Sequence, residues 1–391
     1  MVREIDGFST LDLWAIDLVA QLKVTSELQL VCPLVATPPS GWQGRGSLPD
    51  AIRVLDSTSL RPPELDRLIR DCDVVQVYGG QGWHASRLCR QVVSAARRVG
   101  RKTVVGLSSN RARSALLNEA PHGARDLPRA ARALLAYVGL RANYWWLTSR
   151  ADGTFIVGEG LRRLVAKSCP SLHVGIASWL QASDIAAARE RLNAERGMTP
   201  SVARLSRWCI ASRLEPMKGI HVGIDALARL RAAGRADGLT LTIYGAGPER
   251  ARLDEQVARS GLGEQVVFAG TLTYPLPFLD RLQEHGIVVL PNLNDEQPRI
   301  LFDAISCGCL PVCPDTPAYR ALGLPAALLY EVGDSRSMAA ALDALRQNSA
   351  ALAELHKTLY DIAERHTLES MHAKRAAWIN HEILKARPAG T

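Results

Sequence analysis

Residues 295–303 read DEQPRILFD, with one acid at each end of the stretch. The apolar residues 286–290 before it predict a strand, and the residues after Pro298 predict a helix. Pro298 suits the first turn of that helix, because the N–H that proline lacks would have no partner there. Asp295 and Gln297 stand just ahead, at positions typical of helix caps. The stretch therefore predicts a strand–turn–helix unit of an α/β fold.

The start of the predicted helix favours a bound anion. The N–H groups of Arg299 and Ile300 would point out of the helix, where the dipole is equivalent to about half a positive charge. Phosphate is a common ligand of such a position. Asp303 follows Arg299 by four residues, so Asp295 and Asp303 flank the anion and can accept hydrogen bonds from hydroxyls. A ligand with phosphate in its middle and hydroxyls at both ends is a nucleotide sugar.

Two cations follow an upstream strand. Residues 207–212 predict the strand, and the next residues, RLEPMKG, place Arg213 and Lys218 on either side of a turn with Pro216 and Gly219. Two cations at a strand end can hold a diphosphate, with each charge-assisted hydrogen bond contributing about 1.5–3 kcal/mol.

A glycine turn follows the next predicted strand. Residues 239–244 predict that strand, and Gly245 and Gly247 make a strand-to-helix turn after it. An amphipathic helix extends to Ser260, and residues 265–270 predict another strand. The two glycines are candidates for ligand contact at the strand end.

The segments ASRLEPMKG, YGAGPERARLDEQVARSGLGEQVVFAG and DEQPRILFDAISCGCLPV lie in this order within residues 205–345. Together they resemble the successive signatures of the family-4 glycosyltransferases. The resemblance implies an α/β chain of GT-B architecture, in which two doubly wound Rossmann-like domains face a central cleft. It also implies that a hexose-type sugar moves, with retention, from a nucleotide diphosphate sugar to a saccharide or lipid-linked acceptor, in bacterial polysaccharide or cell-envelope glycan synthesis. No metal or other cofactor is implied.

The resemblance also implies roles for single residues. Arg213 and Lys218 would act in catalysis by holding the diphosphate and stabilising the leaving group, and Asp295 would contact the donor sugar. Asp303 would bond the ribose. Both acids replace glutamates of the family and are one methylene shorter. The implied donor-binding residues are Gly7, Gly245, Gly247, Gln297, Pro298, Arg299, Ile300 and Asp303.

The N-terminal half departs from the family pattern. The chain starts close to the expected glycine loop at Gly7, and Asn110 stands where many relatives have a histidine. We assign Asn110 and His122 to the acceptor side.

Length and patterning predict two domains and a final helix. The 391 residues suit domains at 1–197 and 198–367, with residues 368–391 crossing back to the first domain. Residues 195–204 are the expected hinge. A helix is expected over residues 9–22. Tyr144, Trp145 and Trp146 are expected in the core at the head of a strand, with a membrane interface, where Trp and Tyr are enriched, as the alternative.

The eight cysteines contain no CxxC pair, so we expect free thiols in a reducing compartment rather than a zinc site. The N-terminus lacks the pattern of a signal peptide, and no apolar run reaches about 18 residues. These features predict a cytoplasmic protein.

Positive charge is concentrated in the first half. Residues 1–200 hold 26 Lys and Arg against 18 Asp and Glu, whereas residues 201–391 hold 21 of each. A basic face can attract an anionic membrane or a phosphate-bearing acceptor, or can simply be solvated. No nucleic-acid-binding motif accompanies the charge, so we expect no nucleic-acid partner.

Two other classes of protein are alternatives. A nicotinamide-dependent dehydrogenase would use Gly245 and Gly247, but its third glycine falls at Arg250, and no acid ends the next strand. A catalytically inactive GT-B scaffold or regulatory protein is favoured by the shorter acids and the missing histidine.

Overall fold

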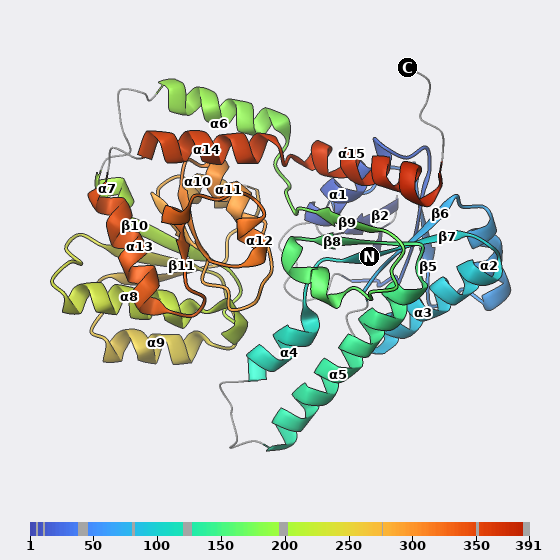
Figure 1. The fold of residues 1–391 in the computed structure, drawn as a ribbon, viewed down its shortest axis with the longest axis horizontal. Coiled ribbons are helices and arrows are strands. Elements are labelled where there is room, and N and C mark those ends of the chain that lie inside the picture. The colour runs from blue at the N-terminus through green and yellow to red at the C-terminus, as the bar shows by residue number, and fades with distance from the viewer. Residues whose placement is uncertain are drawn as a thin grey trace.

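The computed structural model describes residues 1–4, 7–10, 12–37, 46–79, 83–119, 127–194, 202–275, 277–348 and 352–385. The chain forms two α/β halves that lie side by side, the C-terminal half on the left of Figure 1 and the N-terminal half on the right. This arrangement confirms the predicted fold class.

The C-terminal half is built on one six-stranded parallel sheet of order β12-β11-β10-β13-β14-β15. Its strands are apolar and mostly buried, as expected where helices cover both faces of a parallel sheet. The strands are β10 (Arg207–Ala211), β11 (Thr240–Tyr244), β12 (Val266–Gly270), β13 (Ile287–Val289), β14 (Leu310–Pro314) and β15 (Leu329–Tyr330).

Helices flank this sheet, and most follow directly from a strand. They are α6 (Ala182–Ala194), α7 (Val202–Leu205), α8 (Ile220–Ala232), α9 (Arg250–Arg259), α10 (Phe278–Leu282), α11 (Ile300–Ser306), α12 (Pro317–Arg320), α13 (Ser335–Gln347) and α14 (Leu352–Glu364). Leu180 and Ile185 are buried in the same core as the sheet. Helix α6, which the predicted boundary at 197 places in the first domain, therefore packs with the second half.

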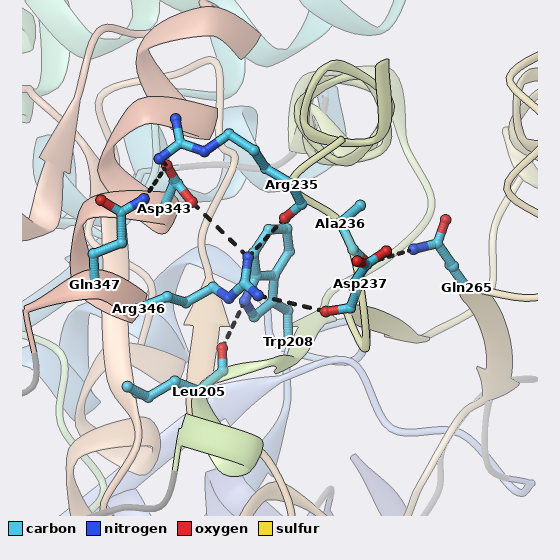
Figure 2. Close-up of polar contacts among 9 residues, drawn as sticks. All are labelled: Leu205, Trp208, Arg235, Ala236, Asp237, Gln265, Asp343, Arg346 and Gln347. Carbon is cyan, nitrogen blue, oxygen red and sulfur yellow. Dashed lines mark hydrogen bonds and ion pairs between the residues drawn. The ribbon is translucent and has the colours of Figure 1, made fainter. Parts of the chain in front are cut away.

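A polar cluster fixes α13 to the turn that precedes β11 (Figure 2). Asp343 forms an ion pair with Arg235 and accepts a hydrogen bond of 3.0 Å from Gln347. Arg346 donates to the carbonyl oxygens of Arg235, at 2.9 Å, and Asp237, at 3.5 Å. These contacts satisfy a buried carboxylate, which would be costly without partners.

The described strands of the N-terminal half divide among three sheets. The largest is parallel and joins β6 (Val74–Tyr78), β7 (Lys102–Leu107), β8 (Gly153–Val157) and β9 (Leu172–Gly175). A parallel pair joins β3 (Leu28–Cys32) and β5 (Ile52–Asp56), and an antiparallel sheet joins β1 (Val2–Glu4), β2 (Gly7–Thr10) and β4 (Gly46–Ser47).

The helices of this half are α1 (Asp12–Leu22), α2 (Pro62–Arg70), α3 (Trp83–Arg98), α4 (Arg111–Glu119) and α5 (Leu127–Arg150), followed by the 3-10 turn η2 (Glu159–Leu164). The helix expected from residue 9 begins at Asp12, because Ser9 and Thr10 pair in β2. The strand expected at residues 144–146 is wrong. The run rich in Ala, Leu and Arg favours a helix, and these residues lie within α5.

Helix α15 (Leu368–Trp378) lies on the N-terminal half and continues as a π-helical turn, Ile379–Ile383 (Figure 1). The indole of Trp378 donates to the hydroxyl of Ser171 at 2.9 Å. The N–H of Leu368 donates to the carbonyl oxygen of Leu180 at 2.8 Å. The two segments that pass between the halves are therefore bonded to each other.

Candidate functional site

The loop after β10 holds Lys218 at the boundary between the halves. The 3-10 turn η3 (Pro216–Lys218) ends at Gly219, which has a φ of +64°. A Cβ at this glycine would collide with the carbonyl oxygen of Pro291. Only glycine therefore allows the loop to pack here, which fixes the backbone at Lys218.

Lys218 is a partly buried cation without an acidic partner. Among the described residues, no carboxylate lies within 4 Å of its ammonium group. Burial lowers the pKa of Lys218, and the nearby carboxylate of Glu296 opposes that shift. A desolvated ammonium with its main acidic influence more than 4 Å away is well placed to receive an anion.

Arg213 lies in the same loop, as predicted. Its side chain is exposed and forms an ion pair of 2.6 Å with Glu215. Its charge also contributes to lowering the pKa of Lys218, after the larger effect of burial.

The two glycines after β11 bring their turn against the Arg213 loop. A Cβ at Gly245 would collide with the carbonyl oxygen of Ser212, and one at Gly247 would collide with that of Leu214. The N–H of Leu214 donates to the carbonyl oxygen of Ala246 at 3.0 Å. These contacts give both glycines a packing role.

Helix α11 begins at Ile300, two residues later than predicted, and Arg299 occupies its N-cap without a side-chain cap bond. The predicted caps are wrong because both side chains have other partners. Asp295 accepts from the N–H of Ala318 at 3.2 Å. Gln297 accepts from the N–H of Ala177 at 2.9 Å and donates to the carbonyl oxygen of that residue at 3.2 Å.

Asp295 makes its contacts with α12 and with η2. Its carboxylate packs against Gly160 of η2, where a Cβ would collide with it, and lies 4.0 Å from the guanidinium of Arg163. The carboxylate thus links α12 to the N-terminal half.

The amides predicted to face an anion are unpaired. Within the described residues, no hydrogen bond satisfies the N–H of Arg299 or Ile300. Pro298 precedes them and has no N–H. The guanidinium of Arg299 lies over the ring of Trp179, 3.0 Å from its centroid, and burial lowers the pKa of Arg299 to about 10.

Asp303 is buried beside Arg299. The hydroxyl of Tyr274 donates to its carboxylate at 3.3 Å. Burial raises the pKa of Asp303 to about 7, although the charge of Arg299 opposes the shift. The carboxyl that the motif assigns to the ribose is therefore engaged by Tyr274.

Glu296 is a site residue that the motif did not predict. Its carboxylate accepts from the N–H of Asn110 at 3.0 Å, across the boundary between the halves. Its negative charge also raises the pKa of Lys218, against the effect of burial. Local sequence carries no signal for this role, because the partner of Glu296 lies in the other half of the molecule.

Helix α4 and Asn110, the residue before it, contact loops of the C-terminal half. Asn110 is buried and accepts from the N–H of Arg113 at 3.0 Å. Arg113 donates to the carbonyl oxygen of Leu293 at 3.4 Å, and Asn118 accepts from the N–H of Met217 at 3.1 Å. The helix therefore contacts both the Lys218 loop and the Glu296 loop.

Two predicted residues are not part of these contacts as described. Gly7 pairs with Glu4 between the antiparallel strands β1 and β2. His122 lies outside the described residues.

A cavity of about 410 Å³ lies between α4, the start of α5 and the loops after β10 and β11. It is lined by Asn118, Glu119, Arg129, Glu215, Pro216, Pro248 and Glu249. Its lining can exchange hydrogen bonds with a hydroxyl-rich ligand.

The described ranges contain no group of three His, Cys, Asp or Glu side chains that could hold a metal ion. The eight cysteines are free thiols. Every helix within those ranges is too short or too polar to traverse a bilayer.

Comparison with known proteins identifies a family match in the C-terminal half. Residues 206–348 match the model of the family described as glycosyl transferases group 1. No curated protein matches the chain significantly.

Solved structures share the fold. Alr3699/HepE of Anabaena in complex with UDP-glucose is 15% identical with a TM-score of 0.61, over 97% of this chain and 98% of that chain. The apo structure of OtsA is 13% identical with a TM-score of 0.64, over 94% and 95%. A UDP-forming trehalose-phosphate synthase from Burkholderia xenovorans, in complex with glucose-6-phosphate, is 14% identical with a TM-score of 0.58, over 81% and 75%. The chain therefore has the GT-B fold of these structures, and its residues 206–348 match the glycosyl transferases group 1 family.

Proposed function

We propose that the chain transfers a hexose-type sugar, with retention, from a nucleotide diphosphate sugar to a saccharide or lipid-linked acceptor in glycan synthesis. The observation that carries this proposal is Lys218, a partly buried ammonium with no carboxylate within 4 Å among the described residues. An anion bound there compensates a desolvated charge.

The proposed mechanism is electrostatic. Charge builds on the diphosphate as the bond to the sugar breaks, and Arg213, Lys218 and the free amides of Arg299 and Ile300 receive it. Groups fixed before the reaction often give the largest single contribution to rate enhancement. Since these groups already supply positive charge, we propose that the reaction needs no metal; transfer should then be unchanged by a chelator.

The proposal gives each of the three acids, Asp295, Glu296 and Asp303, a separate role. Asp303 accepts a ribose hydroxyl in place of the hydroxyl of Tyr274. Asp295 holds the loop through Ala318 and offers its second oxygen to the donor sugar. Glu296 faces Lys218 from the other side of the loop and contacts the sugar or the acceptor.

UDP-glucose is the first donor to test, because similar structures hold UDP or UDP-glucose. The acceptor lies on the side of Asn110 and α4, and the basic first half favours one that carries phosphate. The 410 Å³ cavity beside the Lys218 loop is the candidate acceptor subsite.

An inactive GT-B scaffold is the second candidate, because Tyr274 already occupies Asp303. Thermal melting with UDP, GDP and ADP sugars, combined with an assay for nucleotide release, separates the two. A bound donor stabilises the protein by about 2.7 kcal/mol at a hundredfold excess over Kd.

We expect one donor to raise the melting temperature of the wild type and to be consumed. Lys218→Ala should abolish both effects, while Arg281→Ala, which removes an exposed cation of the same half, should preserve them. Donor binding without nucleotide release would favour the scaffold. No melting shift with any donor at millimolar concentration would contradict the proposal.

A further inference from the structure

Helix α5 exposes an apolar stripe that no described part of the chain covers. Leu127, Leu134, Val138 and Trp145 are 70%, 56%, 55% and 58% exposed. Their spacings of seven, four and seven residues place them on one helix face. The stripe extends over about 27 Å at the helical rise of 1.5 Å per residue. Contiguous exposed apolar surface of this kind usually marks an interaction site.

The opposite face of α5 is already used by the core. Tyr144 and Leu147 are buried there with the strands of the N-terminal half, and Ala133 is also buried. Figure 1 shows α5 beside α4, extending beyond the body of the N-terminal half at the lower edge of the view. The helix is therefore held in place by one face and presents the other to the surroundings.

The charge of α5 is of one sign. The helix carries Arg129, Arg132, Arg141 and Arg150 and no acidic residue. Arg141 lies three residues after Val138 and four before Trp145, so it shares the stripe. Arg132 is also exposed, on another side of the helix. The occupant of this surface must accept both apolar side chains and positive charge.

We propose that α5 docks in the plane of an anionic lipid membrane, with Leu127, Leu134, Val138 and Trp145 in the headgroup–acyl boundary. Interfacial helices combine such an apolar face with arginines that meet lipid phosphates, and tryptophan favours this depth. A second copy of the chain fits less well, because two α5 helices in contact would set arginine against arginine. The inference does not depend on the proposed transfer reaction.

Sedimentation of the full chain with vesicles tests this surface. We expect binding to equimolar phosphatidylcholine and phosphatidylglycerol, little binding to phosphatidylcholine alone, and weaker binding at high salt. The double variant Leu134→Gln, Val138→Gln removes apolar area but retains helix propensity, and should bind at least about tenfold more weakly.

The matched control is Val267→Gln, which removes a similarly exposed valine from β12. Its binding should equal that of the wild type. Arg132→Gln should reduce the preference for anionic vesicles. Circular dichroism and melting show whether each variant is folded.

Unchanged vesicle binding in the folded double variant would overturn the proposal. So would wild-type protein that stays in the supernatant with anionic vesicles. A dimer that the double variant dissociates, together with no vesicle binding, would assign the stripe to a second copy instead.

Discussion

Glu296 shows how one side chain can set the charge of another in this site. Burial favours the neutral amine of Lys218, while the carboxylate of Glu296 favours the ammonium. The proposed donor contact requires the ammonium. Glu296 therefore helps to keep Lys218 in its charged form.

Glu296→Gln should move the alkaline limb of donor binding to lower pH. Glutamine can still accept from the N–H of Asn110, but its lost charge lets the pKa of Lys218 fall further. We expect a weaker complex at pH 8 or above and a smaller effect near neutral pH, measured as donor Kd against pH. Glu284→Gln, which neutralises an exposed acid of the same half, is the control. Superimposable profiles for Glu296→Gln and wild type would refute the coupling.

Asp303→Asn should stabilise the protein increasingly as pH rises from about 4 to about 7. The folded pKa of Asp303 is raised from 3.8 to about 7, so the folded state binds a proton that the unfolded state has lost in this window. The free energy of unfolding of the wild type therefore falls as pH rises through this window. The asparagine variant has no titrating group at this position, so it does not lose this stability. Above pH 7 the gain should be constant. Urea unfolding of both proteins between pH 4 and 8 measures it; a gain independent of pH would contradict the raised pKa.

Among the elements, the strands were predictable and the helix starts were not. Buried parallel strands have apolar runs between turn residues, so β10, β11, β12 and β13 begin within one residue of their predicted positions. Helix starts depend on tertiary partners. Asp295 and Gln297 looked like caps in sequence, yet their carboxylate and amide bond to Ala318 and Ala177, which are far away in the chain.

Local sequence also predicted some residues of the candidate site and missed one that depends on tertiary contacts. The cations Arg213 and Lys218, and the amides of Arg299 and Ile300 at the start of α11, follow from local sequence. Glu296 could not be assigned, because its role depends on Asn110 of the other half. Trp145 was expected in a strand because aromatic residues favour strands, and the helical run around it prevailed.

Gly219→Ala should destabilise the protein more than Gly234→Ala. The two glycines have φ of +64° and +67°, so alanine costs about 1–2 kcal/mol at either from backbone strain. A Cβ at Gly219 would also collide with the carbonyl oxygen of Pro291, whereas a Cβ at Gly234 would have no atom within 4 Å. We expect an additional loss of about 1–3 kcal/mol at Gly219, together with weaker donor binding. Equal unfolding free energies for the two variants would show that the loop adjusts freely.

At the scale of the whole molecule, the C-terminal half contains three histidines that the fold keeps neutral. Burial lowers the pKa of His285, His356 and His366 to about 4. Between their ordinary pKa of 6.5 and about 4, the unfolded chain binds protons that the folded chain does not. Acid therefore destabilises this half at pH values above the ordinary pKa of carboxyl groups.

His356→Leu should reduce the loss of stability as pH falls from about 6.5 to 4. The ring of His356 is buried and its Nε2 has no hydrogen-bond partner, so leucine removes a proton-binding group that contributes no contact of this kind. The urea midpoint of the variant should fall less steeply with acid than that of the wild type. His381→Gln, an exposed histidine, should leave the slope unchanged. An equal slope for His356→Leu would mean that its ring is protonated in the folded state.

The bond between Leu368 and Leu180 has a mechanical consequence. The chain passes between the halves twice, at neighbouring points that this bond ties together, so the linkage resembles one narrow joint rather than two separate tethers. We expect relative movement of the halves to have one soft rotational degree of freedom, with translation strongly restricted. Pairs of spin labels should then report a nearly constant distance beside Leu180 and a broad distribution between α4 and α9, on the far side of the joint. Broad distributions at both places would indicate independent movement instead.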